Sequence, residues 1–145
     1  MKNVLFLCTG NYYRSRFAEI LFNWHAQRRS LSWTAESRGL ALDNCNVGPI
    51  SRHTLYHLQS RGILSDSCGR HPIAVTDADF AAATHVIAVK EKEHRPLIES
   101  GFSKWRDRVE YWQVHDLDCA LPSDAIPQLE QLVLQLLERF ARQAA

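Results

Sequence analysis

The stretch CTGNYYRS, residues 8–15, carries the residues of this sequence best suited to chemistry. Cys8 and Arg14 are separated by five residues, and the stretch directly follows the apolar run NVLFL. A loop of this length can curl so that several backbone N–H groups point inward and bind an anion at the start of a helix, which Ser15 would open. Gly10 gives the freedom that a tight curve needs, and Asn11 is one of the few other residue types that tolerate a positive φ. The loop therefore predicts an anion-binding cradle.

Cys8 and Arg14 would make this cradle reactive. A guanidinium offers a planar pair of donors that fits two oxygens of a phosphoryl group. A cysteine beside a helix amino terminus and a guanidinium favours its thiolate form, which is the nucleophile. The pattern indicates attack of Cys8 on phosphorus and a phosphocysteine intermediate. The alternative is a small buried cysteine that ends a strand, with an arginine in a surface turn. The preceding strand pattern, the following helix pattern and the Gly-Asn-Arg-Ser context favour the phosphate site.

Alternating strand and helix patterns predict how this loop is positioned. We expect strands over residues 3–7, 32–37, 84–89 and 109–114. We expect helices over residues 15–29 and 51–62, a capped helix that begins at 76–79, a short one over 90–100 interrupted by Pro96, and a long one from about residue 123. Such alternation predicts an α/β fold, with a parallel sheet covered on both faces and ligand sites beyond the carboxyl ends of its strands. The loop at 8–15 lies at such an end.

The composition is that of an ordinary globular protein, and we expect residues 1–145 to form a single domain. The net charge of +1 argues against a surface for nucleic acid, and no apolar stretch approaches the ~20 residues of a membrane span. The apolar part of the opening MKNVLFLCTGN is too short for a signal peptide, so we expect a cytoplasmic location. The four cysteines are widely spaced and contain no C-x-x-C pair, which disfavours a metal site or a disulfide scaffold.

The sequence resembles the low-molecular-weight protein tyrosine phosphatases over nearly its whole length. VLFLCTGNYYRSRFAE is similar to the family's opening V-L-F-V-C-x-G-N-x-C-R-S-P-x-A-E. TDADFAAATHVIAV resembles a later helix and strand, and VEYWQVHDLD resembles the strand and loop that end in the family's Asp-Pro. The resemblance implies a three-layer, Rossmann-like fold of the phosphotyrosine phosphatase I type, with a four-stranded parallel sheet. It also implies hydrolysis of phosphotyrosine proteins or small aryl phosphates to inorganic phosphate, with no cofactor and no metal.

The same resemblance assigns roles to individual residues. Cys8 is the nucleophile, Arg14 binds the transition state, and Asp116 is the general acid that then acts as base for water. Asp118 is the competing choice for the acid, and Asp116 is favoured because it aligns with the family's acid. The phosphate-binding loop comprises Thr9, Gly10, Asn11, Tyr12, Tyr13 and Ser15, and Ser37 supports its shape.

Several positions depart from the family pattern. Tyr13 replaces a second loop cysteine that can form a protective disulfide, so peroxide should oxidise Cys8 without that rescue. Leu117 replaces the proline after the acid, and Cys45 replaces an aromatic residue that walls the cleft. Tyr12 and Tyr13 could supply the missing aromatic wall, or they could pack on its rim without a substrate role. Further departures are Asp118, Val89-Lys90 and the segment Arg70-His71-Pro72-Ile73.

Two other functions compete with a cysteine phosphatase. A phosphate- or phosphopeptide-binding module with weak turnover would suit the altered positions Lys90 and Leu117. A thiol-dependent arsenate reductase shares the scaffold, but it needs two more cysteines on a segment that corresponds to residues 78–92, where this sequence has none. We favour the phosphatase. The sequence does not indicate an oligomeric state.

Overall fold

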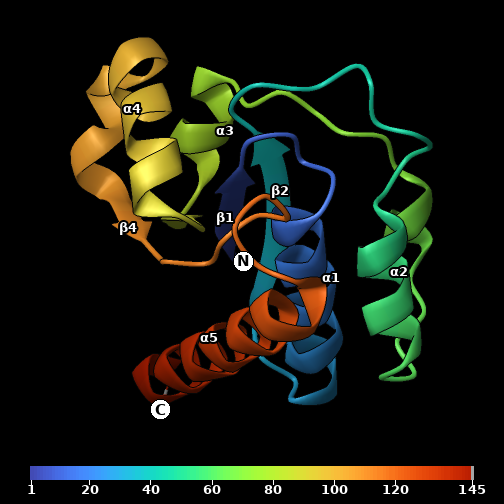
Figure 1. Cartoon of the computed structure of the whole chain (residues 1–145). Coiled ribbons are helices and arrows are strands. Elements are labelled where there is room, and N and C mark those ends of the chain that lie inside the picture. The colour runs from blue at the N-terminus through green and yellow to red at the C-terminus, as the bar shows by residue number, and fades with distance from the viewer. Residues whose placement is uncertain (145) are drawn as a thin grey trace.

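A four-stranded parallel sheet lies between two layers of helices in the computed structural model, which describes residues 1–144 (Figure 1). The strands are β1 (Lys2–Cys8), β2 (Trp33–Gly39), β3 (His85–Ala88) and β4 (Val109–Tyr111). Their order in the sheet is β2-β1-β3-β4, and every neighbouring pair is parallel. The predicted α/β class with a four-stranded parallel sheet is confirmed.

The helices are α1 (Arg14–Arg28), α2 (Arg52–Gln59), α3 (Asp77–Ala82), α4 (Glu91–Gly101) and α5 (Pro122–Ala144), with two short 3₁₀ helices at Asp66–Gly69 and Ser103–Arg108. Two predicted details are wrong. The fourth strand ends at Tyr111, because Gln113 pairs instead with Lys90 in an isolated antiparallel bridge. Helix α4 continues through Pro96, since the loss of one backbone donor does not break it. None of the helices described over residues 1–144 combines the length and the apolar character that a bilayer crossing requires.

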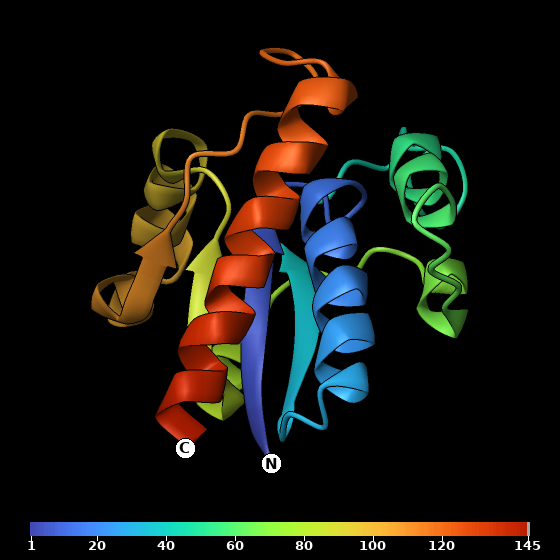
Figure 2. The same cartoon turned by 90° about the horizontal axis from the view of Figure 1, so that it is seen from below.

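Alternate residues of the central strand β1 point to opposite faces of the sheet, as the strand pleat requires. Val4 and Phe6 belong to the larger core, which they share with residues of α1 and α5. Leu5 and Leu7 belong to a second core, which they share with residues of α3 and α4. Figure 2 shows α1 and α5 side by side on one face of the sheet. Both faces of β1 are therefore buried, which fixes the position of the loop that follows it.

The carboxyl end of β1 lies beside the carboxyl end of β2, where Cys8 is paired with Gly39. A Cβ atom on Gly39 would lie 2.8 Å from the carbonyl oxygen of Thr9, which no side chain permits. Glycine at this position lets the loop after Cys8 pass close to β2. The predicted ligand-binding edge of the sheet therefore has the loop of residues 8–15 at its centre.

Candidate active site

The loop between β1 and α1 curls so that its two ends meet. The Sγ atom of Cys8 lies 2.9 Å from the Oγ atom of Ser15, and both residues are buried. Asn11 has a φ of 51°, and its side-chain amide donates a 2.9 Å hydrogen bond to Ser15 Oγ. The left-handed conformation therefore lies at Asn11, whereas the described glycines with positive φ are Gly48 and Gly62. Our expectation that Gly10 provides the tight curve is thus wrong for this loop.

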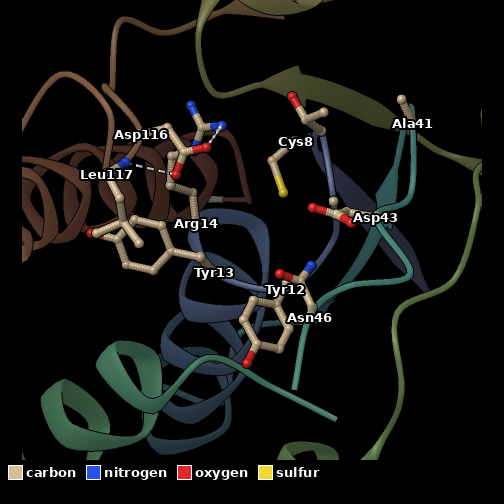
Figure 3. A pocket seen from close by; sticks show the side chains of 11 residues that line it. Cys8, Tyr12, Tyr13, Arg14, Ala41, Asp43, Asn46, Asp116 and Leu117 are labelled. Atoms are coloured by element: carbon tan, nitrogen blue, oxygen red, sulfur yellow. Dashed lines mark hydrogen bonds and ion pairs between the residues drawn. The ribbon is translucent and has the colours of Figure 1, made fainter. Parts of the chain in front are cut away.

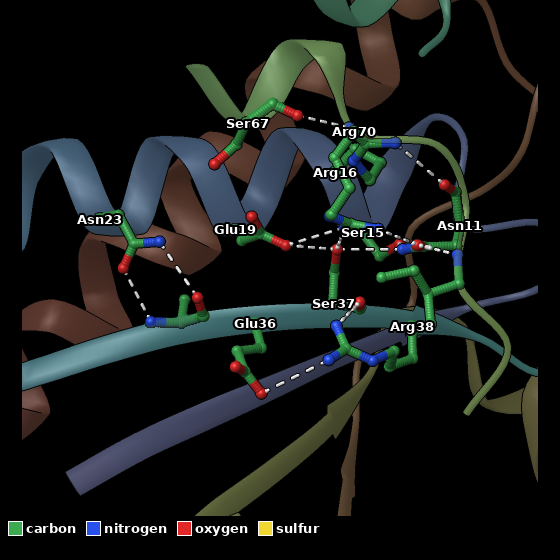
Figure 4. A network of polar contacts seen from close by, with 12 residues as sticks. Asn11, Ser15, Arg16, Glu19, Asn23, Glu36, Ser37, Arg38, Ser67 and Arg70 are labelled. Atoms are coloured by element: carbon green, nitrogen blue, oxygen red, sulfur yellow. Dashed lines mark hydrogen bonds and ion pairs between the residues drawn. The ribbon is translucent and has the colours of Figure 1, made fainter. Parts of the chain in front are cut away.

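A buried polar network holds the loop from below (Figure 4). The amide of Asn11 also donates to Ser37 Oγ at 3.0 Å, and Ser37 Oγ donates to Glu19 Oε1 at 2.6 Å. Arg70 donates to the side-chain oxygens of Asn11, Ser37 and Glu19 at 3.1, 3.0 and 3.2 Å. Ser37 lies where the sequence analysis placed it. Glu19 and Arg70 were not predicted, although Arg70 belongs to a segment that departs from the family pattern.

Arg16 connects this network to the segments that precede and follow α2. Its side chain is fully buried and donates to the backbone oxygens of Pro49 at 2.9 Å and of Ser67 at 2.7 Å. Burial and, to a smaller extent, the nearby charge of Arg70 lower the pKa of Arg16 to about 10. Arg16 follows Ser15 where the family pattern has proline, so the resemblance gave no signal for this contact.

A cavity of about 230 Å³ opens above the loop (Figure 3). The side chain of Cys8 points into it, and Arg14 and Asp116 line it together with Cys8. The other lining residues are Thr9, Gly10, Tyr12, Tyr13, Ala41, Asp43, Asn46 and Leu117. Asn11 and Ser15 do not line the cavity, because their side chains are buried beneath the loop and support it there. Asp43 and Asn46 were not predicted, since they come from the irregular segment after β2.

Arg14 is almost completely buried and is held by several acceptors. Its Nη1 atom donates to the backbone oxygen of Val114 at 3.0 Å. Its Nη2 atom lies 2.7 Å from Oε2 of Glu93 and 3.4 Å from Oδ2 of Asp116. Burial opposes the charged form of Arg14, but the negative charges of Cys8, Glu93 and Asp116 raise its pKa above the ordinary value. The guanidinium is therefore fixed and charged.

Asp116 and Asp118 differ in their position relative to the cavity. The carboxylate of Asp116 lines the cavity and accepts a 2.8 Å hydrogen bond from the backbone N–H of Leu117. Asp118 is exposed and is absent from the lining. Of the two carboxylates, Asp116 is therefore the one that shares the cavity with Cys8.

The two loop tyrosines occupy different environments. Tyr12 lines the cavity, and its hydroxyl donates a 2.5 Å hydrogen bond to the backbone oxygen of Val47. Tyr13 is buried, and its ring contacts His53 edge to face at a centroid distance of 6.3 Å. Burial raises the pKa of Tyr13 to about 12, helped by the negative charge of Asp116. Tyr12 is therefore the more accessible aromatic surface beside Cys8.

Two neighbouring residues of α4 also reach the loop and were missed from the sequence, because they lie on a helix far from the loop motif. Glu93 pairs with Arg14, and both Glu93 and His94 hydrogen-bond to the hydroxyl of Thr9. His94 is fully buried, whereas the sequence analysis gave it no role. Among residues 1–144, no cluster of three histidine, cysteine, aspartate or glutamate side chains could hold a metal ion.

A sequence model of the family described as low molecular weight phosphotyrosine protein phosphatase matches residues 3–143. The chain belongs to this family. The resemblance seen in the loop motif is confirmed over almost the whole sequence, and with it the assignment to the phosphatases. The cysteine at the base of the cavity is consistent with the cysteine-based chemistry of the family.

Comparison with individual proteins extends this result. The chain is 30% identical to the protein-arginine-phosphatase of Bacillus subtilis (strain 168) over 110 residues, which cover 74% of this chain and 67% of that protein. The crystal structure of YfkJ from Bacillus subtilis superposes with a TM-score of 0.85 at 22% identity, over 100% of this chain and 98% of the other. The crystal structure of the low molecular weight protein tyrosine phosphatase from T. tengcongensis superposes with a TM-score of 0.80 at 24% identity, over 96% of this chain and 99% of the other. These structures share the Rossmann-like α/β fold.

Proposed function

We propose that this phosphatase hydrolyses phosphotyrosine or similar aryl phosphate monoesters through a phosphocysteine intermediate. The observation that carries the proposal is the meeting of Cys8, Arg14 and Asp116 in one cavity, although Asp116 lies far from the other two in the sequence. A nucleophile, a planar cation and a carboxyl group are the three groups that this reaction needs.

In the first step, the Cys8 thiolate attacks phosphorus in line with the bond to the leaving oxygen. The sulfur–phosphorus bond forms, the phosphorus–oxygen bond breaks, and Asp116 gives its proton to the departing oxygen. The guanidinium of Arg14 and backbone N–H groups of the loop bind the equatorial oxygens, where the charge of the transition state lies. The products of this step are a phenol and phosphocysteine.

In the second step, Asp116 takes a proton from water as the water oxygen attacks phosphorus. The sulfur–phosphorus bond breaks, which releases inorganic phosphate and restores the thiolate. Ser15 Oγ lies 2.9 Å from Cys8 Sγ and can donate a hydrogen bond to the departing sulfur. Cys8 and Asp116 therefore serve both steps in opposite directions. Cys8 first attacks phosphorus and then leaves it, and Asp116 first gives a proton and then takes one.

The aromatic surface of Tyr12 supports an aryl substrate. Tyr12 lines the cavity with Cys8, whereas Cys45, at the position of the family's usual aromatic wall, lines an adjacent pocket instead. Ring stacking contributes about 0.5–1.5 kcal/mol beyond burial. Steady-state kinetics of Tyr12→Ala should show a larger rise in KM for aryl than for alkyl phosphates, with Tyr12→Phe as the control. Equal effects on both substrate types would argue against an aromatic wall.

A second candidate substrate is protein phosphoarginine. It is favoured by the 30% identity to a protein-arginine-phosphatase and by Asp43, a carboxylate that lines the cavity together with Asp116. A substrate guanidinium would find a charged partner in such a carboxylate, whereas a phenyl ring would not. Hydrolysis of matched peptides that carry phosphotyrosine or phosphoarginine distinguishes the two. If phosphoarginine is the substrate, Asp43→Asn should lower kcat/KM for that peptide and spare the phosphotyrosine peptide.

A further inference from the structure

The two terminal nitrogens of the Arg14 guanidinium both donate hydrogen bonds to the carboxylate of Glu93, a residue of α4. Nη1 of Arg14 lies 3.3 Å from Oε1 of Glu93, and Nη2 lies 2.7 Å from Oε2. The second bond from Nη1 runs to the backbone oxygen of Val114. All hydrogen bonds that Arg14 donates within the described residues leave from these two terminal nitrogens. A guanidinium has five N–H groups, so the edge formed by Nε and the outer N–H of Nη2 is not used by Glu93.

Glu93 itself is held in place by the start of the loop and by its own helix. Oε2 accepts a hydrogen bond from the hydroxyl of Thr9, the residue after Cys8, and lies 3.1 Å from Nε2 of His94. Glu93 does not line the cavity, so it contacts Arg14 from behind. Burial alone would raise the pKa of Glu93, but the hydrogen bonds from His94, Arg14 and Thr9 hold it well below the usual range. The carboxylate is therefore ionised and fixed.

The protonation of His94 follows from its partners. Nδ1 accepts a 3.0 Å hydrogen bond from the backbone N–H of Lys90, so the proton of the neutral ring lies on Nε2. That N–H points toward the oxygens of Thr9 and Glu93, both 3.1 Å away. His94 is fully buried, and rotation of its ring would leave the backbone N–H of Lys90 without a hydrogen-bond acceptor. The ring thus fixes Glu93 in one orientation.

We propose that Glu93 is a positioning residue, which holds Arg14 by its Nη1–Nη2 end so that the Nε–Nη2 edge is presented to the phosphoryl group. This proposal rests on the role of Arg14 in the proposed function. Two equatorial oxygens need two donors in one plane, and a guanidinium free to rotate would lose this arrangement. Asp116 Oδ2 lies 3.4 Å from Nη2, on the same guanidinium that Glu93 holds.

The first test compares Glu93→Ala and Glu93→Gln with Glu91→Ala. Glu91 lies on the same helix but is only partly buried and pairs with Arg95, away from Arg14, so it is a matched control. For an aryl phosphate, Glu93→Ala should lower kcat by ~10- to 100-fold, less than the loss of an oriented donor itself. It should also weaken inhibition by vanadate, whose geometry resembles the transition state. Glu93→Gln keeps one acceptor and should lie between the wild type and Glu93→Ala.

A double-mutant cycle separates positioning from a general structural role. Arg14→Lys removes the planar fork, so Glu93→Ala should cost little more in that background. Additive losses in the double variant, or wild-type kcat and vanadate inhibition in Glu93→Ala, would overturn the proposal. Thermal unfolding checks that the variants remain folded at the assay temperature.

The same variants can be compared without turnover. Vanadate should protect Cys8 from alkylation by iodoacetate in the wild type, and Glu93→Ala should require a higher vanadate concentration for equal protection. Absence of aryl phosphate turnover in the wild type would count against the proposed function alone. Equal protection in the wild type and Glu93→Ala would count against the positioning role.

Discussion

Cys8 Sγ and Ser15 Oγ lie 2.9 Å apart, although the two residues are seven positions apart in the sequence. Asn11 donates its amide N–H to the same hydroxyl oxygen, so the hydroxyl proton of Ser15 can point to sulfur. The contact closes the loop and also places a donor on the atom that must leave phosphorus in the second step. The same hydrogen bond therefore contributes both to the conformation of the loop and to the proposed second step.

Replacement of Ser15 by alanine should therefore slow the second step more than the first. Without the donor, sulfur is a poorer leaving group, because a hydrogen bond to a charged group stabilises it by about 1.5–3 kcal/mol. We expect a burst of phenol release followed by a slow steady state, measured by stopped-flow absorbance. Ser60→Ala is the control, since Ser60 is exposed and donates only to the backbone oxygen of His57. A uniform slowing without a burst would contradict this role.

Alkylation should distinguish Cys8 from the other three cysteines, which are Cys45, Cys68 and Cys119. Cys8 Sγ lies 2.9 Å from Ser15 Oγ in the first turn of α1, and Cys8 lines the same cavity as Arg14. Iodoacetate at about pH 6 should label Cys8 fastest, and inorganic phosphate should protect it. Peptide mass spectrometry reads the site of labelling. Equal labelling of all four cysteines would refute the argument for a reactive thiolate.

Substitution of Arg14 by lysine separates charge from geometry. Lysine keeps the positive charge but has no planar fork for two oxygens, so kcat should fall by at least ~10²-fold. The measurement is steady-state turnover of an aryl phosphate, with circular dichroism as a check on folding. Arg28→Lys, on the same helix and distant from the cavity lining, should retain wild-type activity. Near-normal turnover in Arg14→Lys would leave Arg14 with a structural role only.

The loop and the sheet could be predicted because their signals are local. The apolar run before Cys8, the turn residues between Cys8 and Arg14, and the helical spacing after Ser15 all lie within one short segment. The capping box at Thr76 and Asp79 is local too, and it forms as expected. Such patterns depend on neighbouring residues and need no tertiary information.

Of the residues that support the loop, Ser37 was predicted from the family resemblance, but Glu93, Arg70 and His94 could not be predicted, because they lie far from the loop in the sequence. Glu93 reaches Arg14 across 79 positions, and Arg70 reaches Asn11 across 59. An acidic or basic residue on a helix or loop usually faces water, so neither residue type signals a buried contact. His94 shows the same limit: only the fold reveals that its ring lies between Lys90 and Thr9.

Mild acid should destabilise the protein through its buried histidines. Burial lowers the pKa of His94, and the charge of Arg14 lowers it further, against the opposing effects of Glu93 and Asp116. Below the unfolded value of about 6.5, the unfolded chain then binds more protons than the folded one, so the free energy of unfolding falls as the pH falls. Urea unfolding at about pH 7.5 and about pH 5.5 should show this loss.

Three further groups shape this pH profile. Burial also lowers the pKa of His25 and His57, so His94→Asn should remove only part of the loss. The hydrogen bond from His85 and the charge of Arg139 lower the pKa of Glu110 to about 2, against the effect of burial. That contribution is present above the ordinary carboxyl range and is lost only at stronger acid, below about pH 4. An identical slope between pH 7.5 and 5.5 in the wild type and His94→Asn would contradict the assignment to His94.

The assignment of the acid can be tested by the dependence of rate on the leaving group. If Asp116 protonates the departing oxygen, Asp116→Asn should slow substrates with poor leaving groups most, because an acidic phenol needs little protonation. The comparison must follow the first chemical step by pre-steady-state phenol release, since Asp116 also acts as base in the second. Asp118→Asn should keep the wild-type dependence, because Asp118 is exposed and does not line the cavity. If Asp118→Asn alone gives the steep dependence, then the loop with Leu117 in place of proline presents the other carboxyl group to the substrate, and Asp116 is limited to its contact with Arg14.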